Sequence, residues 1–474
     1  FGFFYFQQSS SKRQREEKKG LSPLSLGFIT EIRNMQSGGD FSNGFHGDHH
    51  RELGWEEKQL GVGGGLSSSF GRAKRRSIRR GPRDLSDGGA NVLRVSDQLA
   101  EHKTLETSES SPSPCTDFDV AYFHSYAHVG IHEEMIKDRA RTDAYRDAIM
   151  HHQSFIQGKV VVDVGCGTGI LSIFCAQAGA KRVYAVDASD IAVQAKEVVK
   201  ANGLSDKVIV LHGRVEDVQI DEEVDVIISE WMGYMLLYES MLGSVITARD
   251  RWLKPGGLIL PSHATLFMAP VSHSDRYSHS IDFWRNVYGI DMSAMMQLAK
   301  QCAFEEPSVE SISGENVLTW PGVVKRIDCQ TIQIQELDSV TAKYRFQSIM
   351  RAPMHGFAFW FDVEFNAPAS SPAKNTSESS AASGSSSISP SGEGNQKKRT
   401  NRSDALLLST SPEAPPTHWQ QTIVYFYDPI DVEQDQVIEG SVTLSQSKEN
   451  RRFMNIHLEY SSAGRSFVKE SVMR

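Results

Sequence analysis

The chain has 474 residues, of which 39% are hydrophobic and 23% are charged, and its formal net charge at pH 7 is −9. This length suffices for two compact domains with tails, and no run approaches the roughly 18 uninterrupted apolar residues of a membrane-spanning helix. The five cysteines form no CxxC pair and no cluster with histidine, so we expect a reducing compartment and no metal site.

Residues 1–115 are rich in glycine, serine and charge, and we expect a disordered N-terminal extension. The basic run at residues 72–80 is equally compatible with a nuclear-import signal and with a solvated tail. We therefore expect localisation to the nucleus, with the cytoplasm as a second compartment. The rest of the chain carries 33 basic and 45 acidic residues, which favours basic protein tails over nucleic acid as partners.

Residues 116–258 are expected to form N-terminal helices followed by an α/β domain with a parallel sheet. Apolar residues near helical spacing mark a helical segment at residues 116–150. Strand patterns at residues 159–164, 182–186 and 224–228 alternate with helical patterns, as in a parallel sheet.

Residues 259–474 are expected to form a β-barrel domain. A long strand over residues 258–271 precedes a helical insertion at about residues 281–306. The β pattern then resumes and alternates well enough for an antiparallel barrel. The strands that it predicts cover residues 327–334, 343–349, 356–365, 422–427, 437–444 and 453–460. A Ser-rich insert at about residues 366–404 interrupts them, and we expect it to be disordered.

A glycine-rich loop, G-C-G-T-G at residues 165–169, follows the first strand. Its spacing differs from the G-x-G-x-x-G of nicotinamide sites, and it lacks the Lys-Ser/Thr of a P-loop. Asp187, at the end of the second strand, can accept two hydrogen bonds from a ribose diol. The pattern favours a ligand that has an adenosine but no pyrophosphate, namely S-adenosylmethionine.

Two glutamates with eight residues between them, Glu230 and Glu239, lie in an otherwise apolar and aromatic loop after the strand at residues 224–228. Ligands of open α/β folds bind at this edge of the sheet. Burying two unpaired carboxylates is costly, and a planar guanidinium matches carboxylates with its fork of N–H donors. An ordinary acid-bearing loop over the core explains the pattern equally well.

Four motifs together resemble those of the type I protein arginine N-methyltransferases. They are Y-F-H-S-Y at 122–126 with I-H-E-E-M at 131–135, the glycine loop, the double-glutamate loop and T-H-W at 417–419. Within the family the chain is most similar to the arginine methyltransferase 6 branch of plants, on the V-Y-A-V-D-A-S run at 183–189 and the Ser-rich insert. The resemblance implies N-terminal helices that act as a lid over the cofactor and a Rossmann-like S-adenosylmethionine-dependent methyltransferase domain, then a β-barrel with a helical dimerisation arm.

The resemblance also implies roles for individual residues. Glu230 and Glu239 would hold the substrate guanidinium, while His418 and Asp138 would either relay a proton or close the pocket. Arg141 would pair with the cofactor carboxylate, Glu216 would contact its adenine, and Met135 would leave room for a second methyl group. The cofactor-binding residues would be His132, Met135, Arg141, Asp163, Gly165, Gly167, Asp187, Ala188, Glu216 and Glu230, and the substrate-binding residues Tyr122, Tyr126, Met241 and Trp419. The family usually has glutamate where this chain has Asp187.

Other functions and assemblies stay open at this point. A catalytically silent scaffold and a nicotinamide dehydrogenase are the alternatives to an active methyltransferase. The expected protein substrates are histone tails or Gly/Arg-rich segments. The apolar residues of the helical insertion favour a head-to-tail homodimer, although the arm could instead fold onto its own barrel.

Overall fold

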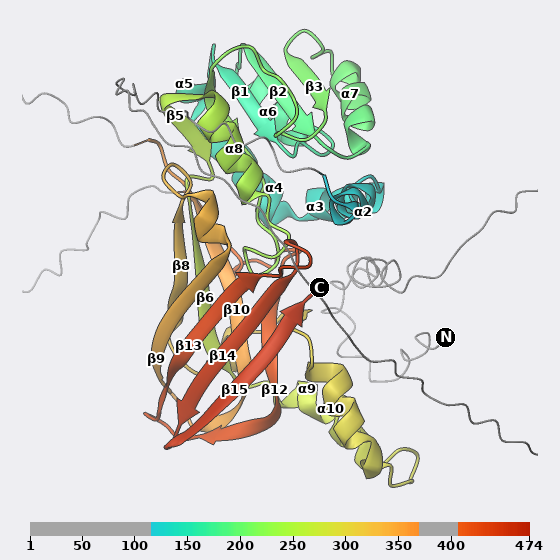
Figure 1. Cartoon of the computed structure of the whole chain (residues 1–474), viewed down its shortest axis with the longest axis vertical. Helices are drawn as coiled ribbons and strands as arrows, with labels where there is room; N and C mark the ends of the chain where they lie inside the picture. The colour runs from blue at the N-terminus through green and yellow to red at the C-terminus, as the bar shows by residue number, and fades with distance from the viewer. Residues whose placement is uncertain (1–114, 369–405) are drawn as a thin grey trace, which may run out of the picture. The chain divides into compact units, whose positions relative to one another are not determined.

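The computed structural model describes residues 115–368 and 406–474 (Figure 1). The predicted N-terminal extension, the basic run and nearly all of the Ser-rich insert lie outside these ranges. Among the described helices, none is long and apolar enough to cross a membrane.

Four helices precede the parallel sheet. A capping box starts the first of them, because the Thr116 side chain accepts from the Asp119 N–H and the Asp119 carboxylate accepts from the Thr116 N–H. Asp138 caps the third by accepting from the Arg141 N–H. The helices are α2 (Asp117–Ser125), α3 (Val129–Lys137), α4 (Arg139–His151) and α5 (Gln153–Ile156).

The parallel sheet has the strand order β3-β2-β1-β4-β5, with helices packed beside it (Figure 1). All five residues of its central strand are buried, as expected for a strand covered on both faces. Its strands are β1 (Val160–Val164), β2 (Arg182–Asp187), β3 (Val208–His212), β4 (Val224–Ile228) and β5 (Leu253–Leu260), and its helices are α6 (Ile170–Gln177), α7 (Ile191–Ala201) and α8 (Leu242–Trp252).

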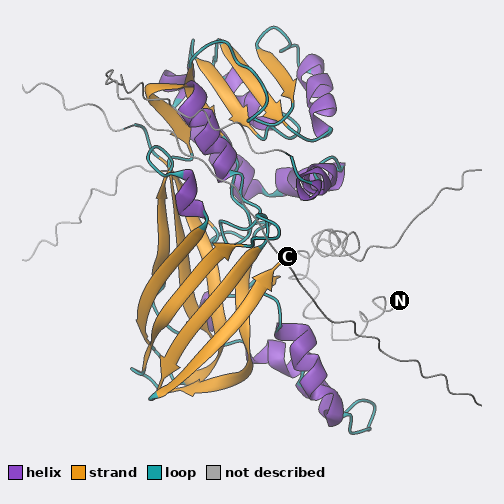
Figure 2. Cartoon of the chain, viewed as in Figure 1, coloured by secondary structure: helices purple, strands orange, loops and turns teal. Residues whose placement is uncertain are grey.

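The remaining strands form the antiparallel barrel drawn in orange below the parallel sheet in Figure 2. One sheet has the order β7-β12-β10-β6-β8, with β11 paired to β10, and the other has the order β15-β14-β13-β9. The strands are β6 (His263–Val271), β7 (Ser308–Glu310), β8 (Gly322–Asp328), β9 (Ser339–Gln347), β10 (Ala352–Phe365), β11 (Leu406–Ser409), β12 (Gln421–Val432), β13 (Val437–Gln446), β14 (Met454–Ser462) and β15 (Arg465–Met473), and short 3₁₀ helices lie at η3 (Gly314–Asn316) and η4 (Ile334–Leu337).

A helical arm leaves the barrel between β6 and β7. Its elements are α9 (Ser274–Ser280), η1 (Asp282–Arg285), η2 (Ser293–Met295) and α10 (Met296–Phe304). Phe304, at its end, is fully buried and stacks on Tyr277, with ring centroids 4.5 Å apart. Tyr288 at the far tip is 89% exposed. The base of the arm is therefore part of a core, while its tip is free of the barrel.

Two strand predictions were wrong, and one long strand was missed. The single strand over residues 258–271 is two strands in different sheets, broken at Pro261, which has no N–H for a ladder, and Ser262, whose N–H donates to the Glu364 carbonyl. Residues 329–334 are not a strand, because the Asp328 carboxylate accepts from the Gln330 N–H and turns the chain. Strand β15 was not predicted at all.

Candidate active site

The double-glutamate loop is anchored where β4 ends. The Ser229 hydroxyl donates to the Val164 carbonyl at 2.8 Å, and the Ser229 N–H donates to the Leu260 carbonyl at 3.1 Å. The first residue of the loop is thus tied to the ends of both neighbouring strands. Further along, a Cβ on Gly233 would lie 1.6 Å from the Tyr238 carbonyl oxygen, so the fold of this loop requires glycine there.

The backbone of this loop is strained. Met235, Leu236 and Glu239 have φ of 50°, 67° and 56°, in the left-handed region that costs a residue other than glycine about 1–3 kcal/mol. Such strain persists where the surroundings overdetermine the conformation, and here Met235 and Leu236 are buried in the main core. The packing of the loop therefore fixes the position of Glu239.

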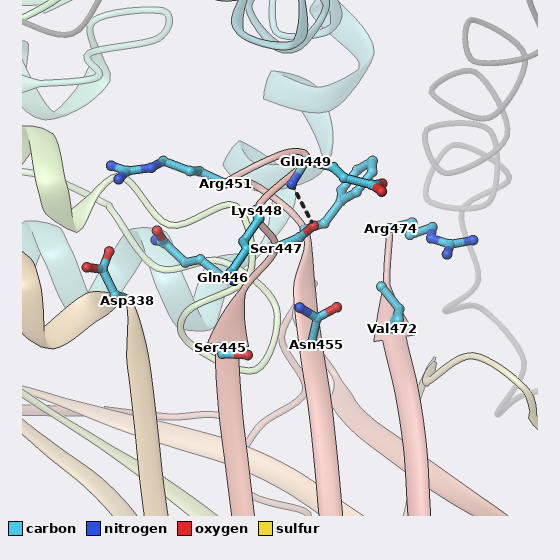
Figure 3. A pocket seen from close by; sticks show the side chains of 11 residues that line it. Asp338, Ser445, Gln446, Ser447, Lys448, Glu449, Arg451, Asn455, Val472 and Arg474 are labelled. Atoms are coloured by element: carbon cyan, nitrogen blue, oxygen red, sulfur yellow. Dashed lines mark hydrogen bonds between the residues drawn. The ribbon is translucent and has the colours of Figure 1, made fainter. Parts of the chain in front are cut away.

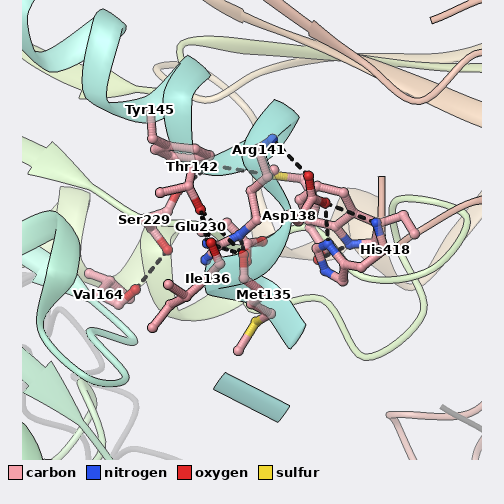
Figure 4. Close-up of polar contacts among 12 residues, drawn as sticks. Met135, Ile136, Asp138, Arg141, Thr142, Tyr145, Val164, Ser229, Glu230 and His418 are labelled. Atoms are coloured by element: carbon pink, nitrogen blue, oxygen red, sulfur yellow. Dashed lines mark hydrogen bonds and ion pairs between the residues drawn. The ribbon is translucent and has the colours of Figure 1, made fainter. Parts of the chain in front are cut away.

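Glu230 forms a buried ion pair with Arg141 (Figure 4). Its Oε2 accepts from the Arg141 Nε at 3.0 Å, and the two side chains are 8% and 7% exposed. Burial raises the pKa of Glu230, and the charges of Arg141 and His418 oppose that effect. Arg141 also donates from Nη1 to the Met135 carbonyl at 3.2 Å, so one guanidinium links α3, α4 and the loop.

Glu239 is the second buried carboxylate of the loop, with 9% of its surface exposed. Burial raises its pKa to about 7, and the charge of Arg452 and a hydrogen bond from Tyr238 partly oppose this. A cation beside Glu239 would stabilise the ionised form. The electrostatics of this site thus favour a positively charged ligand.

Asp138 and His418 meet beside Arg141 (Figure 4). The Asp138 Oδ2 accepts from the His418 N–H at 2.9 Å and from its Nδ1 at 2.7 Å. Burial would raise the pKa of Asp138, but the hydrogen bonds from His418 and from the Arg141 N–H outweigh it and lower the pKa. With the proton on Nδ1, the Nε2 of a neutral His418 carries the lone pair.

Trp419, expected on the wall of the arginine channel, is packed inside the protein. It is 4% exposed, its ring lies edge-on to Phe361, and its Nε1 donates to the Met232 carbonyl at 3.1 Å. A buried indole N–H requires an acceptor, and here the double-glutamate loop provides it. Trp419 therefore holds that loop against the barrel.

The glycine loop forms a close backbone turn, with φ of 72° at Gly165 and 54° at Gly167. A Cβ on Gly165 would lie 2.5 Å from the Met241 Cε, and one on Gly167 would lie 3.0 Å from the His132 Nδ1. His132 donates from Nε2 to the Tyr126 carbonyl at 2.8 Å, and burial lowers its pKa. A neutral imidazole and a thioether therefore face this loop.

Two aspartates, Asp187 and Asp163, lie at or next to the ends of the strands beside the glycine loop. Asp187 accepts from the Gly167 N–H at 2.8 Å and from the Ser189 N–H at 2.8 Å, so it braces the loop from the next strand. Ala188, the next residue in the chain, is half-buried. Asp163 is fully buried, its Oδ2 accepts from Ser172, and its Oδ1 has no hydrogen-bond partner among the described residues. Burial raises the pKa of Asp163 to about 7.

Glu216 lies in the loop after β3. Its carboxylate accepts from the Ser244 hydroxyl at 2.8 Å and is 3.6 Å from the Arg214 Nε. The contact with Ser244 ties this loop to α8.

Helix α2 carries Tyr122, and its C-cap residue is Tyr126, with the two ring centroids 4.7 Å apart. Burial raises the pKa of Tyr122 to about 12, and the charge of Glu239 acts on both tyrosines. Arg452, in the turn between β13 and β14, lies with its Cζ 3.6 Å from the centroid of Tyr122. Arg452 could not be predicted from local patterns, because it is 333 residues from its ion-pair partner Asp119.

The sequence of this chain is similar to those of known methyltransferases. Residues 262–382 and 397–465 match the family model described as the arginine methyltransferase oligomerization subdomain, and residues 149–262 match the model of ribosomal protein L11 methyltransferase. A probable protein arginine N-methyltransferase 6 of Arabidopsis thaliana is 89% identical over 440 residues, which covers 93% of this chain and 100% of the relative. The chain belongs to the protein arginine N-methyltransferase family.

Other proteins similar to this chain are also arginine methyltransferases. Probable protein arginine N-methyltransferase 6.2 of Oryza sativa subsp. indica is 64% identical over 76% of this chain and 90% of the relative. Among solved structures, a Trypanosoma brucei PRMT1 enzyme-prozyme complex with AdoHcy has a TM-score of 0.62, and Arabidopsis thaliana protein arginine methyltransferase 10 has one of 0.61. Each is 33% identical and covers 74% of this chain and 100% of the solved chain.

These relatives confirm the predicted fold class, the resemblance to the plant branch, and an S-adenosylmethionine-dependent protein arginine N-methyltransferase. The matched oligomerization subdomain supports assembly of this arginine methyltransferase into oligomers. The roles of the individual site residues stay predictions.

Proposed function

We propose that this chain is a type I arginine methyltransferase in which Glu230 and Glu239 hold the substrate guanidinium. The observation that carries the proposal is the pair of buried carboxylates on one strained loop, one paired with Arg141 and the other with a pKa raised to about 7 by burial. An incoming guanidinium would supply the cation that Glu239 favours. Two fixed carboxylates would also align the attacking nitrogen and raise its electron density.

The residues around the glycine loop fit S-adenosylmethionine. The orphaned Oδ1 of buried Asp163 can accept from an amino group, and Gly165 and Gly167 allow close approach of a ligand to the backbone. Asp187 and Ala188 would hold the ribose end, Glu216 the adenine, and Arg141 the carboxylate, together with His132 and Met135. When bound, S-adenosylmethionine supplies the methyl group as an electrophilic sulfonium.

Asp138 and His418 would together accept the proton that leaves the guanidinium. The contact between them leaves the lone pair on the His418 Nε2, which can accept a proton, and Asp138 would stabilise the resulting imidazolium. The same contact would alternatively close the substrate pocket, as a structural role for this pair. Tyr122 and Tyr126 would cover the bound arginine, and Trp419 would hold the loop.

Asymmetric dimethylation requires room for a monomethylated arginine to bind again. The flexible thioethers of Met135 and Met241 would leave that room, where a bulky aromatic side chain would not. The test is mass spectrometry of a Gly/Arg-rich peptide and a histone-tail peptide incubated with the enzyme and S-adenosylmethionine. We expect monomethyl and then asymmetric dimethylarginine, whereas symmetric dimethylarginine alone would contradict type I activity.

The proposed substrates are basic protein tails, such as histones or Gly/Arg-rich segments, because the region beyond residue 115 is acidic. The proposed assembly is a homodimer through the arm, whose tip exposes apolar side chains. The proposed compartment is the nucleus, on the basic run at residues 72–80. A fluorescent fusion with the basic residues of that run changed to alanine would test the last point by loss of nuclear signal.

A further inference from the structure

The turn between β13 and β14, residues 447–453, contacts the lid helix α2. Arg452 donates from Nε and Nη2 to the Oδ1 of Asp119, at 3.2 Å and 2.8 Å. Its guanidinium also lies over the ring of Tyr122, and the ring centroids of Phe453 and Phe118 are 6.2 Å apart. Three contacts of different kinds thus join this turn to a single helix.

The turn is built to present Arg452. The Asn450 side chain, which is buried, accepts from the Arg452 N–H at 3.0 Å, and the Asn450 carbonyl accepts from the Phe453 N–H at 2.9 Å. The Ser447 N–H donates to the Phe453 carbonyl and closes the turn. An arginine held by a closed turn loses less side-chain freedom when it binds a partner than one on an open loop does.

The same guanidinium acts electrostatically on Glu239. Among the described residues, the titratable groups whose charges interact with Glu239 are Tyr122 from α2 and Tyr126 at its C-cap, Tyr234 and Tyr238 from its own loop, and Arg452 from the turn. The tyrosines are neutral near pH 7, because burial raises their pKa. Arg452 is the charged member of this set.

We propose that Arg452 is a positioning residue for methyl transfer, which clamps helix α2 through Asp119 and Tyr122 and from there supplies positive charge that acts on Glu239. This inference rests on the proposed function of Glu239. The clamp keeps the two tyrosines over the double-glutamate loop. The charge favours the ionised form of Glu239, which is the form that binds a guanidinium.

The chain offers a matched control in the neighbouring Arg451. Arg451 is exposed and lines a hollow of about 800 Å³ at the β13–β14 turn (Figure 3). None of the predicted site residues lines that hollow. Arg451→Gln therefore removes the same charge from the same turn without touching α2.

The experiment compares Arg452→Gln, Arg452→Lys and Arg451→Gln by hydrogen exchange and by kinetics. We expect Arg452→Gln to speed exchange over residues 117–126, to raise the peptide KM by about tenfold or more, and to move the acid limb of the kcat/KM profile to higher pH. Arg452→Lys keeps the positive charge but not the paired N–H donors of the guanidinium. Hydrogen exchange over α2 should therefore become faster, while the acid limb of the kcat/KM profile stays at its wild-type pH. Arg451→Gln should resemble wild type in all three readouts.

If hydrogen exchange over residues 117–126 in both Arg452 variants is as slow as in the wild type, Arg452 does not clamp α2. If the acid limb of the kcat/KM profile of Arg452→Gln does not move, Arg452 does not act through its charge. Equal effects of Arg451→Gln would overturn both roles, since they would reflect net charge alone. If Arg452→Gln does not fold, hydrogen exchange over residues 117–126 in Arg452→Lys tests the clamp instead. A wild-type enzyme without methyl transfer would instead refute the proposed function, while the exchange data would still report on the clamp.

Discussion

His418 and Asp138 are 280 residues apart in the chain, and the Nδ1 of His418 lies 2.7 Å from the Oδ2 of Asp138. Asp138 is at the same time the N-cap of α4, the helix that carries Arg141 to Glu230. One carboxylate therefore joins His418 to α4, and α4 reaches the double-glutamate loop through Arg141.

Asp138→Asn should destabilise the protein by about 2 kcal/mol at pH 7, because it weakens hydrogen bonds to a buried carboxylate. The folded pKa of Asp138 is lowered from 3.8, so its contribution is present above that pH and is lost as the pH falls through the folded pKa. Urea unfolding of both proteins from pH 7 downwards should show the difference shrink. A difference that persists at the lowest pH would indicate that the charge of Asp138 is not the cause.

Local sequence patterns predicted the strands and loops that are determined by neighbouring residues. They missed the elements and contacts that depend on residues far apart in the chain. The runs that became β1 and β4 and the loop with Glu230 and Glu239 follow from apolar periodicity and two acids in an apolar loop. Strand β15 was missed because Lys469, at a buried position, breaks the expected alternation. Its Nζ donates to the Phe304 carbonyl, a partner 165 residues away. The packing of Trp419 and the clamp by Arg452 likewise depend on partners that the local sequence does not reveal.

Glu239→Gln should stabilise the free enzyme while abolishing turnover. The pKa of Glu239 rises from 4.5 to about 7 on folding, so its favourable contribution is complete below pH 4.5 and is lost as the pH rises to about 7. The advantage of the neutral variant should grow over that interval to as much as ~3 kcal/mol and then level off. Unfolding free energies measured between pH 4 and 9, with roughly unit steps, test this, and a constant difference would contradict the buried position of its charge.

Met135→Phe should shift the product toward monomethylarginine. The Met135 carbonyl accepts from the Arg141 guanidinium, so the backbone of Met135 lies close to the ion pair with Glu230. A bulkier ring there should lower the ratio of asymmetric dimethyl to monomethyl product by about tenfold or more. Mass spectrometry at matched turnover measures the ratio, and an unchanged value would place Met135 away from the methylated nitrogen.

Substitutions at the tip of the arm should produce monomers. Removing the whole arm would take away buried Phe304 and open a core, so charges on exposed positions are the better test. Ile290→Asp with Leu298→Asp should convert a wild-type dimer into a monomer in sedimentation velocity at micromolar concentration. Ile349→Asp, an exposed apolar residue outside the arm, is the control and should stay dimeric. A wild-type monomer that methylates normally would contradict the proposed assembly.

Methyl transfer by Glu230→Gln, measured beside cofactor binding in the same preparation, tests the role of the two glutamates most directly. Glutamine keeps an oxygen for the Arg141 Nε but removes the charge beside the guanidinium, and such a loss typically lowers kcat by about 100-fold or more. We expect that fall on an arginine peptide, with calorimetric affinity for S-adenosylmethionine within a few-fold of wild type. A variant that retains more than about a tenth of wild-type turnover would contradict the proposal that Glu230 holds the substrate arginine.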